Sequence, residues 1–322
     1  MFRNYQLAYL VRNVKIREVR RLTFQEQAMA HVLSKSARQI PHGAVVGHFD
    51  ATPLVEYGKI ASRAAGREGD AKPPESRLRR ALYRHFWPFF IKTMAHSLHH
   101  VPHLNVYLDY TPWRTSGRVY MAEDINIGFT VHTKFGVLKP VMRNAHQKDL
   151  ETVAREMRQL ARRARHTDVN ELYHKAARAY LWTSIRELDL SGLPGLLTWL
   201  RARLQWRKAD VEFQGVAEKD KLGVRDILGA TTTVANIGTK LSGHHTVGVI
   251  MPPEIMSFGI GEVREVPWIL DGKVVPRFAV TIAGTIDHRV FDGGDAFPLY
   301  QHVKHYIDNP HLIYDWKPGD DV

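Results

Sequence analysis

The sequence predicts a mixed α/β fold. Segments with helical periodicity and strand-like runs occur in both halves without regular alternation, and no internal repeat is visible, which argues against solenoids and propellers. The hydrophobic share of 44% and the charged share of 24% are close to the averages of soluble globular proteins. This composition excludes a disordered chain and a collagen-like fibre.

The first half of the chain is predicted to hold two helices and several strands. A helix is expected over residues 22–39, because apolar residues recur at helical spacing and Pro41 disfavours a helical conformation at Ile40. Further along we expect a strand over 45–49, a surface loop with consecutive prolines over 66–76, an aromatic helix over 86–100, and strands over 106–108, 119–121 and 125–130.

Residues 149–165 show the strongest helical periodicity of the chain. Asp149 suits the N-cap, and the arginines of the last turn suit the negative C-terminal end of the helix. The chain as a whole carries 45 basic and 33 acidic side chains, a net charge of +12 that favours anionic partners. No nucleic-acid-binding motif accompanies this basic helix, so we expect no nucleic-acid partner.

Residues 167–228 are predicted to form a helical insertion. Within it, residues 192–208 combine a leucine stripe with Trp199, Trp206 and interleaved basic residues. Such a helix binds a membrane surface or a protein partner, or it packs on its own protein with its arginines in water. The C-terminal third returns to strands over 231–235, 247–250 and 277–286, followed by a helix over 295–307.

Several classes of site and location are excluded by what the sequence lacks. There is no cysteine, hence no disulfide, thiolate metal site or cysteine nucleophile. The apolar runs are shorter than a membrane span, and the first residues lack a secretory pattern, so we expect a cytoplasmic protein, with the mitochondrial matrix as the alternative. His96, His99, His100 and His103 have helical spacing but no acidic companion, and we expect no metal there.

The densest polar cluster lies at residues 287–294, between a predicted buried strand and the last predicted helix. His288 is placed at the end of the strand, and Asp292 follows four residues later beside two glycines. The ordinary pKa of histidine suits proton transfer near neutral pH. A loop histidine without a chemical role fits the bare pattern equally well.

A resemblance to a known family favours the chemical interpretation. The string DHRVFDGG, followed by a helix ending in DNP, resembles the catalytic-domain signature of the dihydrolipoamide acyltransferases of 2-oxo acid dehydrogenase complexes. Further blocks are similar and come in the family's order: Arg20-Arg21 with the helix to Ile40-Pro41-His42, residues 124–165, ATTTVANIG at 230–238 and VIMPPEIMSFGIGEVRE at 249–265.

The resemblance implies a two-layer α/β sandwich of the chloramphenicol acetyltransferase type with a mixed sheet. It also implies homotrimers with active sites between subunits, and coenzyme A as a substrate. His288 matches the general base, Asp292 the motif aspartate held by Arg20 or Arg21, and Asn236 a segment that faces His288 from the adjacent subunit. Gly293 and Ser257 are the expected substrate-binding positions.

The implied reaction is acyl transfer between coenzyme A and an acceptor thiol. A chain without cysteine forms no thioester of its own, so direct attack by the acceptor is the simpler scheme. General-base catalysis contributes about 10²–10⁴-fold and an oxyanion donor about 10²–10³-fold. The acceptor is a dihydrolipoyl group carried by another protein or a different small nucleophile.

The sequence departs from the family pattern in three places. Ala235 replaces the usual oxyanion-donating serine, and Thr233 or Asn236 is the candidate substitute. No lipoyl domain is seen before the predicted catalytic domain at 20–322, only an extension at 1–19. The helical insertion and the charged C-terminal end are also unusual for the family. The charged end favours an isolated trimer over a large cage. A catalytically impaired trimeric scaffold is therefore the alternative to an enzyme.

Overall fold

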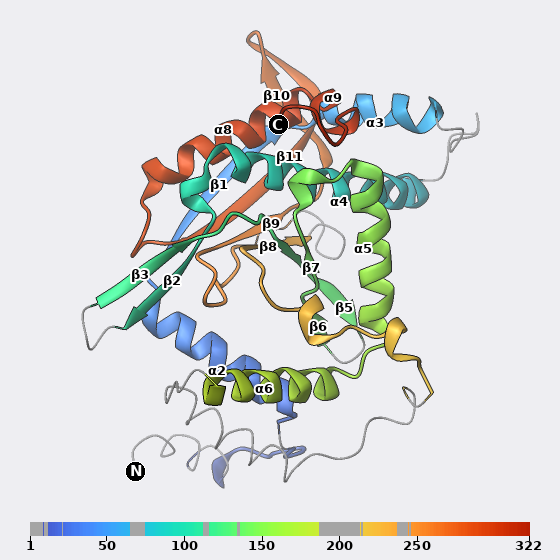
Figure 1. The fold of residues 1–322 in the computed structure, drawn as a ribbon. Helices are drawn as coiled ribbons and strands as arrows, with labels where there is room; N and C mark the ends of the chain where they lie inside the picture. The colour runs from blue at the N-terminus through green and yellow to red at the C-terminus, as the bar shows by residue number, and fades with distance from the viewer. Residues whose placement is uncertain are drawn as a thin grey trace.

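The protein is built on one mixed sheet with a layer of helices packed against it (Figure 1). The computed structural model describes residues 9, 12–20, 22–64, 75–111, 116–133, 136–186, 213, 215–236, 244 and 246–322. The tryptophan-bearing segment 192–208 and most of the predicted loop 66–76 lie outside these residues. No helix among the described residues is long and apolar enough to cross a membrane.

The central sheet has seven strands in the order β1-β11-β9-β8-β4-β7, with β10 paired to β11. β8 runs parallel to β9 and to β4, whereas the other pairs are antiparallel. The strands are β1 (His42–Asp50), β4 (Ile127–Phe129), β7 (Val141–Met142), β8 (Thr232–Asn236), β9 (Met256–Ile260), β10 (Arg264–Leu270) and β11 (Lys273–Asp287). Two small hairpins complete the strands: β2 (Val106–Thr111) with β3 (Ser116–Met121), and β5 (Val131–Thr133) with β6 (Gly136–Leu138).

A layer of helices covers one face of the sheet and forms the core with it. α4 (Glu75–His100) packs against α5 (Leu150–Arg165) and α8 (Gly293–Asp308), while α3 (Thr52–Ala64) and α9 (His311–Tyr314) lie beside them. Gly284 permits this packing, because a Cβ there would lie 2.5 Å from the hydroxyl of Tyr300 on α8. α2 (Phe24–Gln39) and α6 (Val169–Arg186) lie side by side away from that layer (Figure 1).

The predicted strand at 247–250 is wrong, and its place in the sheet is taken by β9. The polar groups of this segment are bonded elsewhere: the Ile250 carbonyl accepts from Ser36 at 2.6 Å, and the Ile250 N–H donates to Nε2 of His42 at 3.4 Å. Because side chains satisfy these backbone groups, the segment needs no partner strand.

The remaining expectations differ from the structure mainly at element ends. α2, β1, α5, β8 and α8 lie within a few residues of the predicted ranges. α4 begins at Glu75, before the predicted start at 86, so residues 75 and 76 of the predicted loop are helical. The sequence did not predict α3 or β10, whereas α6 lies within the helical insertion expected over 167–228.

Candidate active site

The sheet ends at His288, which follows the last residue of β11. Its backbone N–H donates to the Pro41 carbonyl at 3.0 Å, which ties the turn to the start of β1. Its imidazole lies against Gly43: a Cβ on residue 43 would be 2.4 Å from Cδ2 and 2.7 Å from Nε2 of the ring. The side chain is otherwise exposed. The packing therefore orients the ring and leaves it accessible to a reactant.

A buried ion pair supports the turn that carries His288. Asp287 is 0% exposed, and its carboxylate accepts from the backbone N–H of Arg289 at 3.0 Å and from the guanidinium at 2.6 Å. The guanidinium also lies 5.5 Å from the ring centre of Tyr110 on β2. Sequence reasoning missed this pair; the alternation Asp-His-Arg, which places both charges on one side of the turn, was the available signal.

Asp292 is the N-cap of α8. Its carboxylate accepts from the backbone N–H groups of Gly294 at 2.7 Å and Asp295 at 3.1 Å. Arg20 or Arg21 was expected to hold this carboxylate, and the guanidinium of Arg20 instead forms two bonds of 2.7 Å with Glu26. Glu26 lies six residues away at the start of α2, so the local partner is closer. Arg21 lies outside the described residues.

Thr233 and Ser257 lie side by side in register on β8 and β9. The Thr233 hydroxyl donates to Glu254 at 2.5 Å, and Glu254 is buried and paired with Lys139. A threonine hydroxyl has one hydrogen, so Thr233 has none left for an oxyanion in this arrangement. The bond to a buried carboxylate, a strong acceptor, counts against Thr233 as the oxyanion donor, and its expected role stays a prediction.

Ser257 faces the segment that the sequence mistook for a strand. A Cβ on Gly248 would lie 3.0 Å from its hydroxyl oxygen, and within the described part of the chain that hydroxyl has no hydrogen-bond partner. A buried hydroxyl without a partner is uncommon. It is consistent with the expected contact to substrate, which stays a prediction.

Gly293 is the first residue of α8 and is exposed. None of the described residues has an atom within 4 Å of a Cβ placed there. The structure shows no steric reason for glycine at this position, so its expected substrate-binding role stays a prediction.

Asn236 and His288 lie far apart in one chain. Asn236 pairs with Ile260 on β9, and Ile260 pairs with Ile282 on β11. His288 is six residues beyond Ile282, which at about 3.3 Å per residue places it roughly 20 Å further along the strand direction. Ala235, the position without a hydroxyl, lies next to Asn236. One chain thus holds the expected base and the expected oxyanion segment at opposite ends of the sheet.

Among the described residues, Tyr107 is another titratable side chain near Glu254. Burial, and then the negative charge of Glu254, raise the pKa of Tyr107, so its phenol stays protonated at neutral pH. The phenol donates to the Gly229 carbonyl at 3.2 Å. No group of three or more His, Asp or Glu side chains among the described residues could hold a metal ion.

Comparisons with known proteins agree with this architecture. The family model of 2-oxoacid dehydrogenases acyltransferase (catalytic domain) matches residues 14–172 and 206–314. The chain is 23% identical over 287 residues to the dihydrolipoyllysine-residue acetyltransferase component of the pyruvate dehydrogenase complex of Bacillus subtilis, covering 89% of this chain and 49% of that protein. The corresponding Staphylococcus aureus protein is 22% identical, with coverage of 89% and 50%. The chain spans about half the length of these curated relatives.

Solved structures share the fold. A probable dihydrolipoamide acetyltransferase from Listeria monocytogenes aligns with a TM-score of 0.60 and 21% identity, covering 91% of this chain and 94% of that one. The dihydrolipoamide acetyltransferase of Azotobacter vinelandii aligns with a TM-score of 0.62 and 22% identity, covering 93% and 94%. The expected two-layer α/β fold with a mixed sheet is confirmed. The chain belongs to the family of 2-oxoacid dehydrogenase acyltransferase catalytic domains.

Proposed function

We propose that the protein is a coenzyme A-dependent acyltransferase in which His288 is the general base. The observation that carries the proposal is the placement of His288: the ring is fixed against Gly43, the turn is anchored by the Asp287–Arg289 pair, and the ring is open to solvent. Such preorganisation is what proton transfer in a ternary complex requires.

The proposed step moves one acyl group between two thiols. The neutral imidazole of His288 takes the proton of the attacking thiol while its sulfur bonds to the thioester carbonyl carbon. Negative charge develops on the carbonyl oxygen, and when the tetrahedral intermediate collapses, the bond to the leaving sulfur breaks. The imidazolium returns the proton to that sulfur, so the enzyme ends unchanged.

The geometry supports a site completed between copies of the chain. The base and the segment of Asn236 are roughly 20 Å apart along one sheet, too far to act on one carbonyl group. We therefore propose a homotrimer in which Asn236 of one copy faces His288 of the next. In the Azotobacter vinelandii protein, a serine, a histidine and an asparagine have been investigated for roles in the catalytic mechanism.

The acceptor is proposed to be a dihydrolipoyl group on another protein, with acyl-coenzyme A as the other substrate. The related proteins are named dihydrolipoyllysine-residue acetyltransferases, which supports this class of acceptor. The proposed location is the cytoplasm, with the mitochondrial matrix as the alternative.

A trimeric scaffold with impaired catalysis is the second candidate. Two observations favour it: Ala235 has no hydroxyl, and the Thr233 hydroxyl is already bonded to Glu254. Loss of an oxyanion donor slows acyl transfer by about 10²–10³-fold.

An assay with free dihydrolipoamide separates the two candidates. A series of acyl-coenzyme A donors of increasing chain length is incubated with the protein, and released coenzyme A is measured. An enzyme releases coenzyme A with saturable, acceptor-dependent kinetics for at least one donor. A scaffold releases it no faster than the buffer does.

A further inference from the structure

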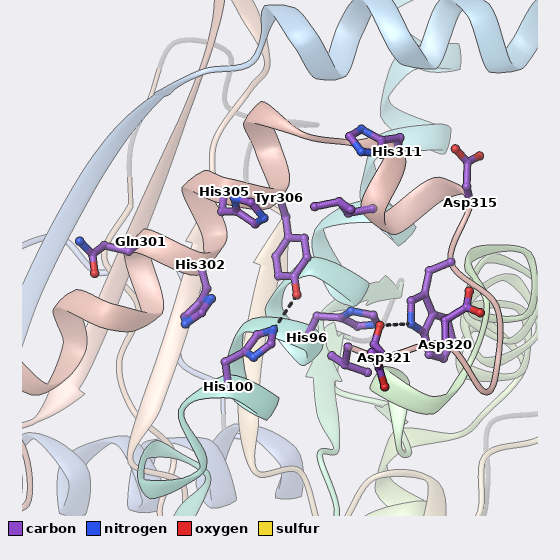
Figure 2. Close-up of a pocket in the computed structure, with 13 residues that line it drawn as sticks. His96, His100, Gln301, His302, His305, Tyr306, His311, Asp315, Asp320 and Asp321 are labelled. Atoms are coloured by element: carbon purple, nitrogen blue, oxygen red, sulfur yellow. Dashed lines mark hydrogen bonds between the residues drawn. The ribbon is translucent and has the colours of Figure 1, made fainter.

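A hollow of about 750 Å³ lies between α4, α8 and residues 311–322 (Figure 2), and His288 is not among its described lining residues. Its volume falls in the range of small-molecule sites. Although the chain has 45 lysines and arginines, none is among the described lining residues. The lining residues are His96, His100, Gln301, His302, His305, Tyr306, His311, Leu312, Asp315, Trp316, Asp320, Asp321 and Val322.

The deepest lining group is His96, whose side chain is 1% exposed. Its ring lies edge-on to Tyr306 and Trp316, with centroid distances of 5.7 and 5.1 Å. Burial, and then the charge of Lys92, lower the pKa of His96 to about 3, so the ring is neutral at pH 7. A hydrogen bond with the backbone of His146 assigns the ring proton to Nδ1, and within the described residues Nε2 has no partner. The base of the hollow thus holds a buried acceptor without a donor.

The histidines of the rim are arranged as stacked rings. His100 and His302 have centroids 4.4 Å apart at an interplanar angle of 12°, and Nε2 of His100 bonds to the Tyr306 hydroxyl at 2.9 Å. Burial, and then the neighbouring histidine charges, lower the pKa of both rings. Stacked rings do not converge their nitrogens on one point, and the described residues contain no group that could hold a metal. Because the pKa of each ring lies below the ordinary value of 6.5, both rings are neutral above pH 7.

Three aspartates supply the charge of the hollow. Asp315 accepts from the Tyr57 hydroxyl at 2.5 Å, Asp320 accepts from the backbone N–H of Lys317 at 2.8 Å, and Asp321 lies exposed beside them. The buried ammonium of Lys92 lies 3.5 Å from the Trp316 ring centre, and burial lowers its pKa to about 7. Above pH 7 the hollow is therefore an acidic region on a chain of net charge +12.

We propose that this hollow binds an organic cation: a protonated amine on a short aliphatic stem. The aspartates attract the charge, the unpartnered Nε2 of His96 accepts a hydrogen bond, and Leu312 and Trp316 provide an apolar wall for the stem. Attraction of this kind is strongest where the neighbouring imidazoles are neutral. The site is separate from acyl transfer at His288.

The binding depends on pH through Lys92, whose ammonium lies against the Trp316 wall of the hollow. Burial lowers the pKa of Lys92 to about 7, so acidification from pH 8 to pH 5 adds a positive charge there, and the cation binds more weakly at pH 5 than at pH 8. The facing groups are Lys92, His96 and His100 on α4, His302 and His305 on α8, His311 on α9, His146 behind His96, and Asp315, Asp320 and Asp321.

Calorimetric titration of the full chain with 1,4-diaminobutane tests the proposal. Butane-1,4-diol, of equal length without charge, serves as the ligand control. We expect saturable binding of the diamine at pH 8, none of the diol, and weaker binding at pH 5. The D320N/D321N variant should bind about fivefold more weakly per charge removed, as expected for one unit charge a few ångströms away in water.

The matched control is Asp271→Asn, which removes one carboxylate at an exposed hairpin turn remote from the hollow. It should bind like the wild type. Equal binding of diamine and diol, equal losses in both variants, tighter binding at pH 5, or a preference for Zn²⁺ over the diamine each overturn the proposal. Unchanged thermal unfolding of D320N/D321N shows that a loss of binding is not a loss of folding.

Discussion

The imidazole of His288 leaves no room for a side chain at residue 43. A Cβ there would lie 2.4 Å from the ring, well inside van der Waals contact, so the glycine defines where the ring sits. This contact places an exposed imidazole against the start of β1. Residue 43 therefore offers a test of the site that leaves the proposed base, His288, unchanged.

Gly43→Ala should lower kcat for acyl transfer by about 10–100-fold, because a displacement of the base near 1 Å has an effect of that size. The fold should persist, because the ring can turn out toward solvent. Steady-state kinetics with thermal unfolding distinguish the two effects. Gly223→Ala is the matched control, since a Cβ there meets Asp226 at an ordinary 3.6 Å. Equal kcat values in both variants would show that the contact does not position the base.

Ala235 is the second position where a small change is informative. Ala235→Ser adds the hydroxyl that the family pattern carries beside the asparagine, so kcat should rise by about 10–100-fold if no other donor serves the oxyanion. The rise is read from released coenzyme A at saturating donor. An unchanged kcat would indicate that another group, such as the Asn236 amide, already stabilises the charge.

At the scale of the elements, the turn after β11 depends on a buried charge pair. Asp287 is 0% exposed and is neutralised by Arg289, whose side chain is 20% exposed. Removing one partner of a buried pair leaves an uncompensated charge, which costs about 3–5 kcal/mol. The turn therefore links stability to the placement of His288.

Arg289→Met should lower the free energy of unfolding by about 3–5 kcal/mol and reduce activity, because the Asp287 carboxylate then lacks its partner. Urea unfolding followed by circular dichroism measures the loss. Arg264→Met, at an exposed position of β10, is the control and should change stability by less than about 0.5 kcal/mol. A similar loss in both variants would mean that the pair does not hold the turn.

Helices with one apolar face were predictable from the sequence, and the choice between adjacent strand-like runs was not. α5 has a clear period and a capping aspartate, so its bounds were predicted within a residue. The runs at 247–250 and 256–260 are both apolar, and the second joins the sheet because it pairs with β8 and β11. Pairing between residues distant in sequence leaves no local signal.

At the scale of the whole molecule, the histidines of the core make folding sensitive to acid. Burial, and then the Lys92 charge, lower the pKa of His96 to about 3, and burial followed by the His99 charge lowers that of His146 to about 4. The ordinary value is 6.5. Below it the unfolded chain binds protons that the folded chain does not, so stability falls as the pH drops from 6.5 toward 4.

Each ring should contribute a slope of about 1.4 kcal/mol per pH unit across that window. His96→Leu should lower the slope of the unfolding free energy against pH by about 1.4 kcal/mol per pH unit. The free energy of unfolding is measured in urea at pH 7, 6 and 5. His31→Leu, on the exposed surface of α2, should leave the slope unchanged. A wild-type protein of constant stability from pH 7 to 5 would contradict the prediction.

Which residues meet at the candidate active site is also a property of the whole molecule. The motif makes His288 a candidate, but its distance to Asn236 depends on the register of three paired strands. The partners of Thr233 and Arg20 likewise come from Glu254 and Glu26, which no motif connects to them. Motifs therefore name candidate residues, whereas the fold decides which residues meet.

The proposed role of His288 as the general base is tested by the rate of coenzyme A release by wild type and His288→Ala. Both are assayed with acetyl-coenzyme A and dihydrolipoamide at equal concentrations of folded protein. We expect kcat of His288→Ala to fall by at least about 100-fold, with little change in the KM for the donor, because only proton transfer is removed. An alanine variant that turns over at the wild-type rate would contradict it.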